Sequence, residues 1–121
     1  MTGFYIHVPF CDKKCSYCDF YSIESVGLIE RYVDTVIREI ERRADTVPGP
    51  ITSVFFGGGT PSLLSPLQLQ RIIDTILRET RITSDAEWTM ECNPGTVSQS
   101  SLTAYRSSGI NRLSFGVQSI H

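Results

Sequence analysis

Residues 112–118 read RLSFGVQ, and their alternation indicates which kind of α/β sheet the chain forms. Successive side chains of a strand point to opposite faces, so the leucine, phenylalanine and valine share one face. Polar or small residues share the other face. The same period of two runs through residues 4–8 (FYIHV) and 87–92 (EWTMEC). One face of the predicted sheet is therefore apolar, to receive helices, and the opposite face is polar.

Amphipathic stretches separate the predicted strands. From residue 28 to residue 44, apolar side chains recur at helical spacing with charged residues between them. Ser65 followed by Pro66 predicts a helix N-terminus, because serine is a good cap and proline is favoured at the first helical position. Residues 98–107 predict a shorter helix that Gly109 ends. The apolar stripes of the first two helices are expected to contain Leu28, Tyr32, Val33, Val36, Ile37, Ile40, Ala44, Leu69, Ile72, Ile73, Ile76 and Leu77.

The order strand, helix, strand, helix predicts parallel βα units with right-handed connections. Residues 51–56 (ITSVFF) supply the second strand, whose low polar content suggests cover on both faces, and residues 57–59 (GGG) are expected to end it. A polar face suits a barrel lumen better than a doubly wound sheet. A complete barrel of eight units needs roughly 200 residues or more. We therefore expect residues 1–121 to be the N-terminal portion of one α/β barrel domain, truncated after about four parallel strands.

Charge and hydropathy exclude some partners. Lysine and arginine number 11 and acidic residues 13, a formal charge of −2, which does not favour binding to nucleic acid or to an anionic membrane surface. No apolar run approaches membrane-spanning length, and the first residues lack the pattern of a secretory signal. The sequence thus predicts a cytoplasmic protein without a transmembrane segment. In that reducing compartment clustered cysteines are more often metal ligands or catalytic thiols than disulfides.

Three cysteines, Cys11, Cys15 and Cys18, stand close together in the stretch CDKKCSYC. They lie in a long loop of weak secondary-structure pattern, which compact domains seldom contain unless the loop is functional. An iron–sulfur cluster held by three thiolates would order this loop. One iron would keep an open coordination site, where a small molecule with amine and carboxylate donors could chelate.

Other interpretations of the cysteines stay open. A tetrahedral zinc site would take His7 or His121 as its fourth ligand, although zinc motifs usually present two separated cysteine pairs. The fourth cysteine, Cys92, is expected to be a buried small apolar residue.

Polar and glycine residues gather at the predicted carboxyl ends of the strands. Residues 56–62 (FGGGTPS) let the backbone approach a ligand closely, but match no phosphate-binding motif, and a tight turn without a ligand is the alternative. Glu91 on the polar face needs a hydroxyl, an amine or a cation. Arg112 could pair with a carboxylate, from Glu91 or from a ligand. Gln118 could hold a cofactor or a substrate, or make a plain polar contact.

The spacing C-x3-C-x2-C, with Tyr17 before its last cysteine, resembles the signature of radical SAM enzymes. In that superfamily the unique iron of a [4Fe-4S] cluster binds S-adenosylmethionine through its amine and carboxylate, and an electron from the cluster cleaves the sulfonium to a 5′-deoxyadenosyl radical. The motif follows the first strand of a partial (β/α)6 TIM-like barrel. GGGTPS is similar to the element that binds the methionyl amino group in that superfamily.

A longer set of motifs resembles one branch, the family of oxygen-independent coproporphyrinogen III oxidase (HemN) and the haem chaperone HemW. The matching stretches are YIHVPFC, CSYCDF, GGGTPS, ECNPGT and RLSFGVQS, which extend from Tyr5 to Ser119. The resemblance implies that Cys11, Cys15 and Cys18 bind the cluster and that Glu91 meets the ribose hydroxyls. The implied contacts of S-adenosylmethionine are Tyr5, Tyr17, Gly58, Gly59, Thr60, Glu91 and Gln118. Two interpretations of His7 stay open: a histidine of the core, or a member of the site.

One departure from the oxidase pattern concerns Phe20. The oxidase carries a further cysteine two places after its third ligand, and this chain has Phe20 there. This favours the HemW type, a chaperone that binds haem and S-adenosylmethionine, over the oxidase, which decarboxylates coproporphyrinogen III to protoporphyrinogen IX. The implied partners are S-adenosylmethionine, haem or a porphyrinogen, and an electron donor if the protein is catalytic. No residue is assigned a catalytic role.

Overall fold

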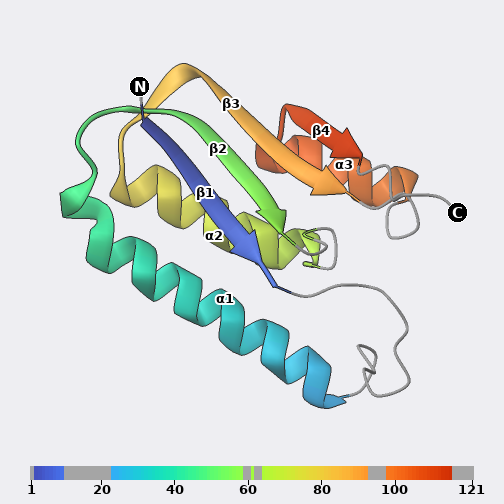
Figure 1. The fold of residues 1–121 in the computed structure, drawn as a ribbon. Helices are drawn as coiled ribbons and strands as arrows, with labels where there is room; N and C mark the ends of the chain where they lie inside the picture. Colours follow the sequence, from blue (N-terminus) through green and yellow to red (C-terminus); the bar gives the residue numbers. More distant parts are fainter. Residues whose placement is uncertain (1, 10–22, 59–60, 62–63, 93–97, 116–121) are drawn as a thin grey trace, which may run out of the picture.

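Strands and helices alternate along the chain in a computed structural model that describes residues 2–9, 23–58, 61, 64–92 and 98–115 (Figure 1). Only the backbone is described for residues 23–26. The elements in chain order are β1 (Thr2–Val8), α1 (Ile23–Arg43), the short 3-10 helix η1 (Ala44–Thr46), β2 (Ile51–Gly58), α2 (Pro66–Glu79), β3 (Ile82–Cys92), α3 (Gln99–Ser108) and β4 (Arg112–Phe115).

The strands form one parallel sheet in the order β1-β2-β3-β4. Because the spatial order follows the chain order, right-handed connections place every helix on the same side of the sheet. The helices also pack on one another, α1 on α2 and α2 on α3. A doubly wound sheet would need a reversal of strand order, which the described strands lack. The predicted barrel-type arrangement is confirmed.

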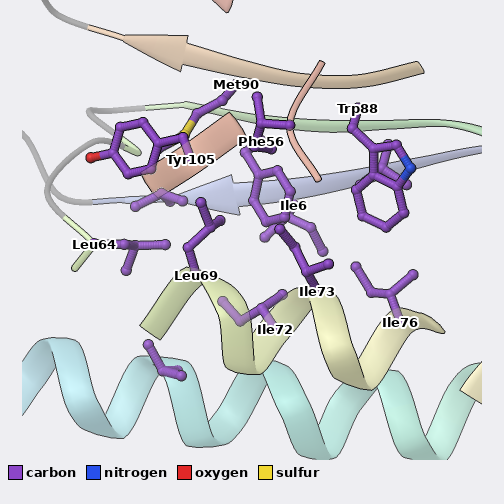
Figure 2. Close-up of a cluster of buried hydrophobic side chains, with 14 of the residues drawn as sticks. Ile6, Phe56, Leu64, Leu69, Ile72, Ile73, Ile76, Trp88, Met90 and Tyr105 are labelled. Atoms are coloured by element: carbon purple, nitrogen blue, oxygen red, sulfur yellow. The ribbon is translucent and has the colours of Figure 1, made fainter. Parts of the chain in front are cut away.

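The hydrophobic core lies between the sheet and the helices. Ile6, Phe56 and Met90 are paired across β1, β2 and β3 and point to the helix side. Figure 2 shows Ile6 and Phe56 facing Ile72 and Ile73 of α2. All five side chains are buried, and burial of each such residue contributes about 1.5–3 kcal/mol to folding. This layer holds the strands in register and leaves their other face open.

The helix boundaries largely match the sequence pattern. Ser65 caps α2 in a capping box with Gln68, and Pro66 is the first helical residue. Ser98 caps α3, and Gly109 at φ 122° ends it. The helix α1 begins at Ile23, earlier than expected. The caps therefore confirm two of the predicted helix starts.

Two leucines assigned to the buried stripes are exposed. Leu28 is 50% exposed because it lies about 100° around α1 from the buried Ile29. Leu77 is 52% exposed for the same reason, one residue beyond the buried Ile76. Both stand at the edge of an apolar stripe rather than in it, and their predicted burial is wrong.

The strands depart from the pattern in three ways. β3 begins at Ile82 rather than at residue 87. β2 continues through Gly58, so its first two glycines are strand residues rather than terminators. The prediction that β2 is covered on both faces is wrong, because Ser53 and Phe55 lie half-buried on the face away from the helices.

Among the helices that the structure describes, none has the length and apolar character needed to span a membrane.

Candidate functional site

The face of the sheet away from the helices is built in rows, because parallel pairing aligns residues of neighbouring strands. A row across all four strands consists of Tyr5, Phe55, Thr89 and Arg112. The next row towards the carboxyl ends contains the pairs His7 with Gly57 and Glu91 with Ser114. The polar face predicted from the alternation is therefore confirmed for the described strands.

Glu91 is joined to the glycine segment of β2. Its Oε1 accepts a hydrogen bond from the backbone N–H of Gly58 at 3.1 Å. Its Oε2 accepts from no group among the described residues. The bond places the Glu91 carboxylate where β2 and β3 end, and its contact with a ligand's hydroxyl or amine stays a prediction.

Glycine is needed at Gly57 and Gly58 because neighbouring atoms occupy the space of a side chain. A Cβ on Gly57 would lie 2.6 Å from Cε1 of Phe55 and 3.0 Å from Oε1 of Glu91. A Cβ on Gly58 would lie 2.6 Å from Cε1 and Nδ1 of His7, and its φ of 107° is left-handed. Side chains here would displace Glu91 and His7, so the glycines keep the end of the sheet closely packed.

Tyr5 and His7 form a polar pair on the same face of β1. The Tyr5 hydroxyl lies 3.1 Å from Nδ1 of His7. The Tyr5 ring stacks on Phe55 of β2, with centroids 5.9 Å apart and planes inclined by 19°. Tyr5 is 55% exposed, so its ring is held on one side and open on the other. This arrangement fits a tyrosine that contacts a ligand.

Tyr32 of α1 donates a hydrogen bond to the backbone carbonyl of His7. Burial raises the pKa of Tyr32 to about 12, with a smaller contribution from Tyr5, so the hydroxyl stays protonated at neutral pH. Sequence analysis placed Tyr32 in an apolar stripe and missed this contact. The signal was its phenol group among aliphatic residues, since a half-buried tyrosine hydroxyl usually finds a partner.

Arg112 pairs with Glu87 rather than with Glu91. Its Nη1 lies 3.2 Å from Oε1 of Glu87, and both side chains are largely exposed. Arg112 stands opposite Thr89 in the register, one row below Glu91, and its guanidinium extends away from the carboxyl end. The two ionic side chains border a hollow of about 200 Å³, whose other lining residues are Ser53, Val54, Phe55, Thr89 and Ser114.

Several predicted site residues lie outside the described residues, and their roles stay predictions. They are Cys11, Cys15, Tyr17, Cys18, Phe20, Gly59, Thr60, Gln118 and His121. The described part of the chain contains no group of three or more histidine, cysteine or acidic side chains arranged to hold a metal ion. Cys92 is buried, and burial raises the pKa of its thiol to about 11. Its predicted role as a small apolar residue is confirmed.

Comparisons with known proteins agree with this geometry. A profile described as the Radical SAM superfamily matches residues 5–121. The chain is 40% identical over 120 residues to the haem chaperone HemW of Buchnera aphidicola and 41% identical over 118 residues to that of Escherichia coli. The matches cover 97% and 95% of this chain but 32% and 31% of those proteins. The chain thus spans about a third of the length of these relatives.

A solved structure shares the fold. Coproporphyrinogen III oxidase (HemN) from Escherichia coli, described as a radical SAM enzyme, superimposes with a TM-score of 0.82 at 30% identity. The match covers 99% of this chain and 29% of that one. The four βα units therefore correspond to the first part of a TIM-like barrel of the type predicted from the sequence.

Proposed function

The chain belongs to the radical SAM superfamily, and on that premise we propose that it holds a [4Fe-4S] cluster through Cys11, Cys15 and Cys18. S-adenosylmethionine would lie across the carboxyl ends of the strands. When bound, the cluster would supply the electron that cleaves the sulfonium. The observation that carries the proposal is the pairing of Glu91 with the Gly58 amide. It supports the proposal because this carboxylate lies at the end of the sheet from which the cysteine segment leaves β1.

The described residues have distinct roles in this proposal. The second oxygen of Glu91 accepts hydrogen bonds from the ribose hydroxyls, and Tyr5 presents a hydroxyl and an exposed ring. Gly57 and Gly58 let Phe55, His7 and Glu91 pack closely against the backbone of β2 beside them. Tyr32 fixes the carbonyl of His7, near the start of the cysteine segment. Gly59, Thr60, Tyr17 and Gln118 complete the proposed cofactor contacts.

For the protein as a whole, we propose the function of a haem chaperone of the HemW type, which binds haem and S-adenosylmethionine and transfers haem to another protein. The two HemW relatives are 40% and 41% identical to the chain, whereas the HemN oxidase is 30% identical. Phe20 stands where the oxidase pattern has an additional cysteine. The expectation of a cytoplasmic protein stays a prediction.

A second candidate is the oxidase activity itself, which the superposition on HemN favours. It would decarboxylate two propionates of coproporphyrinogen III and would need an electron donor. The same polar face would then orient S-adenosylmethionine beside a substrate rather than beside a transferred haem.

The first experiment tests the cluster. Protein purified without oxygen and reconstituted with iron and sulfide should contain both elements, and S-adenosylmethionine should change the electron paramagnetic resonance spectrum of the reduced cluster. Cys15→Ala should abolish the signal, whereas Cys92→Ala, which removes a buried thiol remote in sequence from the motif, should retain it. A colourless protein with one bound zinc ion would support the zinc alternative and contradict the proposal.

The second experiment separates the chaperone from the oxidase. The reconstituted protein is incubated with haem in one assay and with coproporphyrinogen III, S-adenosylmethionine and a chemical reductant in another. Stable haem binding without turnover is the expected result. Formation of a tricarboxylic intermediate or of protoporphyrinogen IX would establish the oxidase instead.

A further inference from the structure

We infer that His7 is a positioning residue of the candidate site. Its ring orients the Tyr5 hydroxyl and packs against Gly58, where β1 lies beside the end of β2. The inference rests on the proposed function for the identity of the ligand that Tyr5 meets. His7 contacts both of these groups.

The burial of β1 argues against a core histidine. Ile6 and Val8, on either side of His7, are buried against the helices, whereas His7 is exposed on the opposite face. An exposed imidazole contributes little to stability through apolar burial. The contacts of His7 are therefore the evidence for its role. They come from three separate elements of the fold.

The first contact is with Tyr5, two residues earlier on the same face. A neutral imidazole that carries its proton on Nε2 accepts a hydrogen bond at Nδ1. The Tyr5 hydroxyl, 3.1 Å away, can then donate to His7. Its oxygen lone pairs remain open to a donor on the ligand, such as an ammonium group. His7 thereby determines which way the phenolic O–H points.

The second contact is with Gly58. The imidazole atoms Cε1 and Nδ1 occupy the space that a Cβ of Gly58 would take, at 2.6 Å. The same residue donates its N–H to Glu91. His7 therefore packs against the backbone that positions Glu91, and it links the tyrosine of β1 with the carboxylate of β3.

The third contact fixes the histidine itself. The backbone carbonyl of His7 accepts a hydrogen bond from the hydroxyl of Tyr32 on α1. The backbone of His7 is held from the helix side of the sheet, while its ring acts on the open side. This combination suits a residue whose ring must keep one orientation.

A double-mutant cycle tests the link to Tyr5. Affinity for S-adenosylmethionine is measured by equilibrium dialysis on the reconstituted protein for Tyr5→Phe, His7→Leu and the double variant. Each single change should weaken binding by about threefold to tenfold, the loss of one hydrogen bond. The double variant should lose less affinity than the product of the two single losses, because part of the effect of His7 passes through the Tyr5 hydroxyl. Independent, multiplicative losses would overturn the inference, because they would show that His7 does not act through the hydroxyl.

A conservative variant adds a matched control. His7→Asn places an amide oxygen near the position of Nδ1 and should restore most of the affinity, whereas His7→Gln places its amide farther out and should not. Equal losses in the two variants would contradict an acceptor role for Nδ1.

A readout without cofactor separates this inference from the proposed function. The NMR signal of the Tyr5 Cζ carbon, identified by its loss in Tyr5→Phe, should shift in His7→Leu and return in His7→Asn. Gly58→Ala should destabilise the protein less in a His7→Ala background than in the wild type, since the ring that it meets is absent. Absence of S-adenosylmethionine binding in the wild type would reject the proposed function. An unchanged Tyr5 signal or equal stability losses would reject the role of His7.

Discussion

Glu91 of β3 accepts the backbone N–H of Gly58 of β2 at 3.1 Å, across the carboxyl ends of two neighbouring strands. The bond satisfies one oxygen of a half-buried carboxylate, and it holds a residue with a left-handed φ at the point where β2 ends. Since a charged group accepts a stronger hydrogen bond than a neutral one, the carboxylate shapes the glycine segment, and in the proposed complex its second oxygen meets the ligand.

Glu91→Gln should separate these two roles. The amide oxygen can still accept the N–H of Gly58, so the free energy of unfolding should change by less than about 1 kcal/mol. The negative charge is lost, however, and hydrogen bonds to charged groups contribute about 1.5–3 kcal/mol, so affinity for S-adenosylmethionine should fall by about tenfold or more. Equilibrium dialysis and urea unfolding of the same variant measure both effects.

Glu87→Gln is the matched control, since it makes the same change on the same strand and face. Glu87 pairs with Arg112, and a largely exposed ion pair contributes about 0–1 kcal/mol. Neither stability nor cofactor affinity should change much. An equal loss of affinity in the two variants would mean that overall charge, rather than the position of Glu91, governs binding.

The placement of Glu91 on the open face could be predicted from the sequence, but its partner could not. Alternation within a strand shows which residues share a face. It contains no information about the register between strands, and that register brings Gly58 to Glu91 and sets Arg112 opposite Thr89. For this reason Arg112 pairs with Glu87 rather than with Glu91, one of the two partners that the sequence left open.

Helix patterns had a similar limit. Caps are local, so Ser65 marked the start of α2 correctly, and the start predicted at residue 98 coincides with the Ser98 cap of α3. Whether an apolar residue at the edge of a stripe is buried depends on the width of the packed surface, and Leu28 and Leu77 lie beyond it. The hydroxyl of Tyr32 finds a carbonyl on another element, a contact that only the assembled fold creates.

Gly58→Ala should destabilise the protein strongly. Its φ of 107° is unfavourable for alanine, and the new Cβ would lie 2.6 Å from the His7 ring. Together these should lower the free energy of unfolding by about 1–3 kcal/mol in urea titrations. Gly27→Ala is the control, because this helical position has no atom within 4 Å of an added Cβ. It should stabilise by about 0.5–1 kcal/mol, and a loss there comparable to that of Gly58→Ala would refute the steric explanation.

Alkaline pH should weaken the fold through Cys92. Burial raises the pKa of its thiol from 9.0 to about 11, so between these values the unfolded chain releases a proton that the native state retains. The contribution of the thiol to stability is complete below pH 9 and falls as pH rises towards 11, by about 2–3 kcal/mol. Urea unfolding at several pH values should show this decline. Cys92→Ala should be less stable at neutral pH but should lose less stability over that interval, and identical slopes would contradict the assignment.

Tyr32→Phe should loosen the end of β1 from which the cysteine segment departs. The change removes the hydrogen bond to the His7 carbonyl while keeping the ring in its half-buried place. Unfolding should become easier by about 1 kcal/mol. If the proposed cluster binds at this end, the reconstituted variant should also release iron to a chelator faster than the wild type.

Tyr105→Phe is the matched change on α3, where a buried tyrosine packs away from the open face. It should also lower stability, because a buried hydroxyl is removed, but it should leave the rate of iron release unchanged. The comparison separates the effect of where the hydroxyl lies from the stability that any buried hydroxyl contributes. Equal iron release from the two variants would show that Tyr32 stabilises the fold without ordering the segment that carries the cysteines.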